Sequence, residues 1–416
     1  MKRSITLLAV TMSLSFGTSA SAQTLLNPVG PPMPPASQTG PAYPHTVGEG
    51  SALNGTMYGP PSVAGDASEW QGAPCEDCGS SYDGCGDLCC APSQPAWFGS
   101  VTGLIMSRDR ANALWTTFET NNNPNQLMST QDADADWAGG AEIAVGRWWC
   151  QSGLQFSIFG LDTLEGFASV RDTNNLLSTP LDLTTQTGDI LIGARPAGDF
   201  FDNAREHRIS RRDDIWNIEL NYLYQPMLGV PSRFQVTWLG GVRWFRFDER
   251  LIFASVAGDG AVVNAGGSEF GNNLGIDEAY LRSRAQNDLV GPQIGAWANY
   301  YITPRFSMFA QPKFGIYGNS ISVRSHLYSG DGITAFDYSG SKTDVSFLGQ
   351  VDLGATIQLT DNWRLRGGYR AIAVSGIALS DEQIPHFLAA ADEFQQVDSN
   401  GSLILHGAFV GADWRF

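Results

Sequence analysis

Residues 345–359 read VSFLGQVDLGATIQL, and the alternation in this stretch decides the fold class. Its odd positions form an apolar face, and its even positions form a polar face that is interrupted only by Leu348 and by small residues. A period of two is typical of a strand whose faces meet different surroundings. The apolar face of such a strand could pack in the core of a soluble sandwich or contact lipid, so the rest of the chain must decide between them.

The chain begins with a predicted secretory signal peptide at residues 1–22. Lys2 and Arg3 precede a short apolar core, and Ala20-Ser21-Ala22 forms a small-residue cleavage site. This core is too short for a membrane-spanning helix. We therefore expect the mature protein to be exported.

Two further segments precede the strand-rich region. Residues 23–74 are rich in Pro, Gly and Ser, which predicts a disordered tether because such a segment cannot bury a core. Residues 75–96 are rich in cysteine. In an exported chain, disulfides are favoured over a zinc knuckle, and the odd number of cysteines in the cluster suggests a bridge to the one remaining cysteine. The disulfide candidates are Cys75, Cys78, Cys85, Cys89, Cys90 and Cys150.

Composition narrows the class of protein. The formal net charge of -17 argues against nucleic acid as a partner. The 47 glycines, 11% aromatic residues and only 16% charged residues suit a β-rich envelope protein. No mature segment reaches the roughly 20 consecutive apolar residues of a helical span, so any insertion into a membrane must use strands.

Residues 97–416 are predicted to form a closed antiparallel transmembrane β-barrel of about ten strands, with twelve as an alternative. Each of the ten stretches approaches or exceeds the roughly 9–11 residues that a tilted strand needs to cross a bilayer. We expect these strands at residues 97–107, 138–149, 152–164, 214–224, 233–249, 289–301, 305–319, 345–359, 362–375 and 403–416.

The connections between these stretches alternate between short and long. Tight periplasmic turns and long outer loops alternate in this way in outer-membrane barrels. The order predicts a bacterial outer-membrane protein with both mature termini in the periplasm. We expect contact with outer-membrane lipid, and recognition by the barrel-assembly machinery through the terminal Phe416.

The polar faces of the predicted strands carry both signs of charge, which is unsuitable for a dry sandwich core. They could line a selective pore. Because opposite charges in so narrow a barrel would pair, we favour a lumen that is filled. The predicted lumen-lining residues are Glu142, Glu219, Arg243, Lys313, Asp352, Arg364, Arg366, Arg370, Asp413 and Arg415.

No catalytic, nucleotide-binding or metal-binding motif stands out, and no cofactor is expected. His207 with Asp213 or Asp214 resembles the Asp/His rim of ten-stranded outer-membrane proteases, in which a carboxylate orients an imidazole. Four arginines crowd the same segment, so local ion pairing is the favoured interpretation.

Several phrases also carry a family resemblance. They are GLQFSIFG at residues 153–160, WNIELNY at 216–222, GVRWFRFDE at 241–249 and PKFGIYGN at 312–319. The region 97–416 resembles β-barrel porin family seven, an outer-membrane barrel family found mainly in planctomycete bacteria. The resemblance implies the architecture, but it implies no particular activity.

Together these patterns predict an outer-membrane β-barrel that is structural or porin-like, with a narrow charge-lined lumen and long surface loops. Unknown small solutes or surface partners fit this interpretation. A rim-active outer-membrane hydrolase and a secreted soluble β-sandwich that binds a ligand are the alternatives.

Overall fold

The structure of the protein is a computed structural model that describes residues 96–149, 151–185, 188–226, 233–258, 277–384 and 396–416. The predicted signal peptide and tether lie outside the described residues. So do all but the last residue of the predicted Cys-rich segment and all six cysteines, including Cys150.

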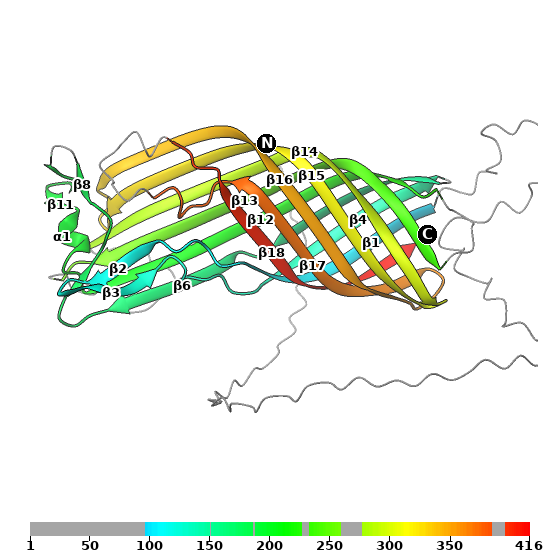
Figure 1. Cartoon of the computed structure of the whole chain (residues 1–416), viewed down its shortest axis with the longest axis horizontal. Helices are drawn as coiled ribbons and strands as arrows, with labels where there is room; N and C mark the ends of the chain where they lie inside the picture. The colour runs from blue at the N-terminus through cyan, green and yellow to red at the C-terminus, as the bar shows by residue number, and fades with distance from the viewer. Residues whose placement is uncertain (1–95, 150, 186–187, 227–232, 259–276, 385–395) are drawn as a thin grey trace, which may run out of the picture. The chain divides into compact units, whose positions relative to one another are not determined.

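Ten antiparallel strands form a closed ring (Figure 1). Each strand pairs with the next one around the ring, and the final pairing of β12 with β13 closes it. The predicted all-β barrel of ten strands is therefore confirmed. In ring order the strands are β12 (Glu206–Tyr224), β13 (Phe234–Val256), β14 (Glu278–Thr303), β15 (Phe306–Ser329), β16 (Thr334–Gln358), β17 (Trp363–Ile377), β18 (Gly401–Arg415), β1 (Ala96–Arg108), β4 (Ala138–Trp149) and β5 (Ser152–Leu161).

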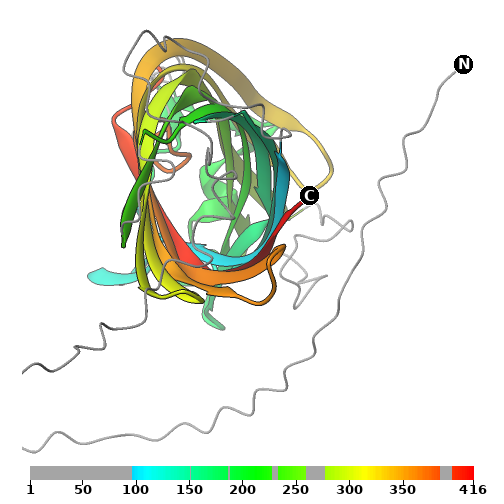
Figure 2. The same ribbon diagram turned by 90° about the vertical axis from the view of Figure 1, so that its right-hand side faces the viewer.

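The two ends of the barrel-forming chain meet beside each other. The amide of Trp97 donates to the carbonyl of Phe416, and the amide of Phe416 donates to the carbonyl of Trp97, both at 3.0 Å. This β1–β18 seam lies at the end of the barrel where the connections β4–β5, β14–β15 and β16–β17 are tight turns. Figure 2 shows the ring from that end.

A belt of apolar side chains surrounds the outside of the ring. On β16, Val345, Phe347 and Leu353 are 55%, 44% and 54% exposed, whereas Leu348 and Asp352 on the opposite face are buried. The apolar face of this strand therefore points outward, which excludes a soluble sandwich core for it. The belt continues around the ring through Val101, Ile143, Leu154, Leu220, Val242, Val290, Ile294, Ile316, Leu365 and Val410.

Several predicted long loops prove to be strand. β15 and β16 continue to residues 329 and 334, so only residues 330–333 connect them where a loop over 320–344 was expected. The predicted loop over 165–213 likewise contains β6 (Leu164–Arg171), which pairs with the first half of β12. The remaining small elements of this end are β2 (Trp115–Glu119), β3 (Asn122–Ser129), β7 (Leu177–Ser178), β8 (Thr184–Thr185), β9 (Gly188–Asp189), β10 (Leu191–Ile192), β11 (Arg195–Pro196) and α1 (Gly198–Phe201).

The physical reason for this error lies on the outer face of the wall. Along β13 the outward positions pass from Val242 and Trp244 to Arg246, Asp248 and Arg250. The backbone ladder continues without a register change, but the outward face there meets water and no longer needs apolar residues. Apolar alternation therefore identifies only the part of each strand that contacts lipid, and it misses the continuation of the strand into water.

Two positions that could disturb a strand leave the register unchanged. Pro312 lies within β15, yet the β14–β15 register is the same on both sides of it. The ladder is also continuous at Gly240-Gly241 on β13, and Phe245 and Phe247 beyond it face inward.

The sole helix in the described part of the chain is α1, with four residues. None of the described helical residues forms a segment that is long and apolar enough to cross a membrane.

Candidate functional site

Charged side chains from seven strands meet inside the membrane-level part of the barrel, and we call this set the lower network. Glu219 on β12 pairs with Arg243 on β13 and, at 2.9 Å, with Lys313 on β15. Asn217 and Asn221 donate to the same carboxylate at 3.1 and 2.9 Å. All these groups face inward because they share one parity of their strands.

A second group of ion pairs continues the lower network across the barrel. Arg370 on β17 donates to Asp352 at 2.9 and 2.7 Å and to Glu142 at 2.5 Å. Arg366 lies 3.5 Å from Glu142 and 3.2 Å from Asp413. Gln350 joins the two groups because it accepts from Arg243 and donates to Asp352 at 3.0 Å.

The charges of the lower network balance. Four carboxylates (Glu142, Glu219, Asp352, Asp413) face four cations (Arg243, Lys313, Arg366, Arg370). Buried charges are tolerated when each is paired and hydrogen-bonded. Arg364 and Arg415 also have inward parity, on β17 and β18 near the tight-turn end. The structure thus places all ten predicted residues on the inner face and joins eight of them in one network.

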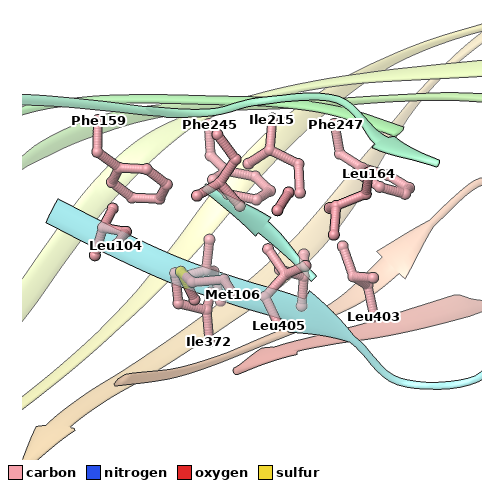
Figure 3. Packing of buried hydrophobic residues seen from close by; sticks show 14 of the residues in the cluster. Leu104, Met106, Phe159, Leu164, Ile215, Phe245, Phe247, Ile372, Leu403 and Leu405 are labelled. Atoms are coloured by element: carbon pink, nitrogen blue, oxygen red, sulfur yellow. The ribbon is translucent and has the colours of Figure 1, made fainter. Parts of the chain in front are cut away.

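An apolar layer lies above the lower network and crosses the whole interior (Figure 3). Phe159, Phe245 and Phe247 extend from one wall, and Leu104, Met106 and Ile372 approach them from the other. Each of these side chains is at most 2% exposed. The interior is therefore charge-lined in layers, and this hydrophobic layer separates one charged layer from the next.

A second ionic cluster lies above the apolar layer, and we call it the upper network. Arg108 on β1 donates to Asp213 at 2.9 Å and to Glu249 at 2.8 Å. Arg211 pairs with Glu249 and lies 3.4 Å from Asp381. All five side chains are buried, and the outward neighbours at this level are charged, so the cluster lies beyond the apolar belt.

The upper network holds three carboxylates and only two guanidinium groups. One acid is therefore in excess, and burial favours its neutral form. Burial and the nearby Glu249 raise the pKa of Asp213 to about 6, although Arg108 opposes the shift. Glu249 takes both arginines and the Ser380 amide as partners, and its pKa falls to about 2 despite its burial.

Residues 378–384, which follow β17, fold into the barrel and close the top of the upper network. Asn287 on β14 donates to the carbonyl of Ala378 at 2.8 Å and accepts from its amide at 2.9 Å. Ser283 donates to the carbonyl of Ser380 at 2.7 Å. Ala378, Leu379, Ser380 and Asp381 are nearly inaccessible to solvent. We call residues 378–384 the inward loop.

The far end of the barrel holds another apolar cluster. Phe200 and Phe201 of α1 pack with inward residues of β12 and β13, such as Ile209 and Phe253. Leu181 and Leu183 from the segment between β6 and α1 join the cluster. Side chains therefore occupy the interior in four successive layers: ionic, apolar, ionic and apolar.

The suggested rim site does not assemble. His207 and Asp213 lie six residues apart on one strand, about 20 Å at the strand rise. Asp214 faces outward and accepts from Thr163 at 2.8 Å. His207 is buried, with Nε2 3.1 Å from the carbonyl of Phe201 and Nδ1 2.9 Å from the hydroxyl of Thr117. Burial lowers the pKa of His207 to about 3, so the imidazole is neutral and both its nitrogens are occupied.

No family model matches the sequence, and no curated protein matches it. The resemblance to β-barrel porin family seven is therefore not confirmed. Among the residues that the structure describes, no group of three or more potential metal ligands is present.

The ring, the apolar belt and the buried ionic interior define an outer-membrane β-barrel protein. The chain is similar to the outer membrane protease OmpT from Escherichia coli, with 12% identity over 77% of this chain and 96% of that chain and a TM-score of 0.37. It is also similar to a major outer membrane protein from Thermus thermophilus (13% identity, 77% and 99% coverage, TM-score 0.28) and to the Pseudomonas putida toluene transporter TodX (10%, 77% and 89%, TM-score 0.29). These likenesses are too distant to assign an activity.

The upper network was not predicted from the sequence. Arg211 and Asp213 share the parity of Glu219 along the same strand, and Glu249 shares the parity of Arg243. Extending the alternation past the apolar belt would have placed all three inside the barrel.

Proposed function

We propose that the protein is a closed outer-membrane barrel with a structural, surface-presenting role, and that it is neither an open diffusion pore nor an enzyme. The observation that carries this proposal is the filled interior. The lower network, the apolar layer of Phe159 and Phe245, the upper network and the inward loop succeed one another along the axis. A hydrated solute would have to displace all of them.

The extension beyond the belt supports the surface-presenting role. β13 to β16 each have 23 to 26 residues, about twice the length that a bilayer requires. The apolar belt covers only the half near the tight turns, so the other half stands in water. This half carries the small elements β2, β3 and α1.

We also propose that both mature termini are periplasmic and that the barrel-assembly machinery recognises Phe416. Tight turns are typical of the periplasmic side of such barrels, and the β1–β18 seam lies at that end. The sequences at residues 153–160 and 241–249 support membership of β-barrel porin family seven. We further propose that an N-terminal tether precedes the barrel and that the cysteines form disulfides.

Planar-bilayer recording of the purified, folded full-length chain tests the closed state. We expect no conductance steps at moderate voltage, while an open porin inserted under the same conditions gives regular steps. Regular steps from the folded chain would overturn the proposal. Heat-modifiable migration on an unboiled gel verifies that the sample is a folded barrel.

A further inference from the structure

Four arginines lie side by side on the outer wall above the apolar belt. Arg212, Arg250, Arg284 and Arg324 are direct cross-strand partners on β12, β13, β14 and β15. All four face outward, since the inward positions of these strands are the neighbouring residues of the other parity. We call this set the arginine row.

Three members of the row have an acidic partner. Arg212 lies 3.3 Å from Glu165. Arg284 forms a bidentate pair with Asp248, and Arg324 forms one with Asp337.

Arg250 differs from the other three. It occupies an interior position of the row, between Arg212 and Arg284, and forms no ion pair with any described residue. Like charges directly opposite each other on neighbouring strands are destabilising. An arginine that is flanked by two others without an acid of its own is therefore a position where an external anion would be stabilising.

The position of the row relative to the membrane indicates where that anion comes from. Arg250 lies six residues beyond Trp244, the last apolar outward residue before the charged positions Arg246 and Asp248, which corresponds to about 20 Å along the strand. At a strand tilt near 40°, the row lies about 15 Å above the hydrocarbon boundary. The headgroup layer of a simple bilayer is only about 5–8 Å thick, so the height favours a lipid whose headgroup is a larger saccharide.

Guanidinium groups suit phosphate as a ligand. Each can donate two parallel hydrogen bonds to one phosphate, which adds geometric specificity to the charge attraction. The apolar belt directly below, with Val242 and Val290 on the same strands, offers a surface for the acyl chains of the same molecule.

We propose that the arginine row, centred on Arg250, binds a phosphate group on the saccharide headgroup of an outer-leaflet glycolipid. The proposal rests on the outer-membrane placement of the barrel, but it is independent of whether the interior is closed. The recording experiment above and the binding experiment below can therefore fail separately.

The test uses the folded full-length chain in detergent micelles and a purified lipopolysaccharide with a phosphorylated inner core. Binding is measured as the rise in the heat-unfolding midpoint with lipid concentration. Arg250→Gln should weaken this binding about tenfold, the loss of one charge-assisted contact. Arg110→Gln is the matched control, because Arg110 is exposed and lies on the connection after β1, outside the row.

Two further samples separate the sources of phosphate. The same lipopolysaccharide after chemical removal of its phosphates should stabilise the wild type far less, and inorganic phosphate at equal phosphate concentration should have little effect. Equal binding by Arg250→Gln and wild type, or by the dephosphorylated lipid, would overturn the proposal. Equal stabilisation by inorganic phosphate would identify a free-anion site and overturn the lipid assignment. If Arg250→Gln does not fold, Arg250→Lys is used in its place. Lysine keeps the positive charge but cannot donate two parallel hydrogen bonds to one phosphate, so this variant should bind with intermediate affinity.

Discussion

Arg370 and Asp352 are direct cross-strand partners in the β16–β17 ladder, and their side chains form a bidentate ion pair inside the barrel. Arg370 also reaches Glu142 on β4, so this one guanidinium pairs with carboxylates from two different walls. Such a pair contributes to stability mainly because its loss would leave charges buried without partners.

Replacing Arg370 with Leu should destabilise the folded barrel by about 3–5 kcal/mol, since Asp352 and Glu142 would both lose their main partner. Urea unfolding followed by gel migration of unboiled samples measures the difference. The double variant Arg370→Leu/Asp352→Leu should recover part of the loss. Arg324→Leu, which breaks a pair on the exposed outer wall, serves as the control and should have little effect. A loss no larger for Arg370→Leu than for this control would contradict the proposed importance of the lower network.

Leu353 and Ser341 lie on the same outward face of β16, within and beyond the apolar belt respectively. Leu353→Arg should cost about 2–4 kcal/mol, because it places a charge against lipid. Ser341→Arg should be nearly neutral, since that part of the wall meets water and its cross-strand partner is the uncharged Ser322. Folding yields into lipid vesicles provide the measurement. Similar yields for the two variants would show that the belt does not mark the membrane boundary.

The excess acid of the upper network predicts a pH dependence. The pKa of Asp213 is raised in the folded state, so its contribution to stability is fully present below its ordinary pKa of 3.8 and is lost as the pH rises through about 6. The unfolding free energy should therefore decrease between pH 4 and pH 7, by on the order of 3 kcal/mol for this group.

Asp213→Asn should remove this part of the pH dependence and stabilise the barrel at pH 8. The asparagine keeps the shape of the side chain but removes the excess charge. Asp214→Asn is the natural control, because the adjacent side chain faces outward. Urea unfolding at several pH values distinguishes the two variants. An unchanged slope in Asp213→Asn would show that another group carries the titration.

Asn287 holds the inward loop through two hydrogen bonds to Ala378. Asn287→Leu removes both bonds, at a cost of roughly 1–3 kcal/mol for the groups left unpaired. Hydrogen exchange of the amides at residues 378–380 should then accelerate while that of the belt strands stays the same. Asn400→Leu, at an exposed position before β18, tests whether any substitution near the loop has this effect. Equal protection in wild type and Asn287→Leu would mean that other contacts hold the loop.

Sequence alternation predicted the number of strands and the direction of each face because lipid imposes a strict rule on outward positions. Phe347 and Leu353 must be apolar, and Asp352 between them must then face inward. The same parity placed Glu142, Glu219 and Arg370 on the inner face, although it could not tell which of them would pair. Ion pairing depends on the register between strands and on how far each side chain extends across the barrel. The sequence of a single strand shows neither of these.

Beyond the apolar belt the outward positions meet water, so they no longer need to be apolar. Arg250 faces water and Glu249 faces the interior, so both faces of β13 carry charge there and the apolar outward face that marks the belt is lost. The packing of Phe200 and Phe201 into the open end depends on contacts between segments far apart in the chain. The strand extensions and the upper network were missed for these reasons.

The seam between β1 and β18 has a consequence for the order of assembly. Arg366 on β17 donates to Thr102 on β1 at 2.8 Å and pairs with Asp413 on β18, so its complete set of partners exists only when the first and last strands have met. A curved sheet that entered the membrane before this meeting would present unpaired guanidinium groups and carboxylates to hydrocarbon. Insertion and ring closure should therefore be one concerted event. A partner that shields the open edges until Trp97 and Phe416 join would lower the barrier to that event.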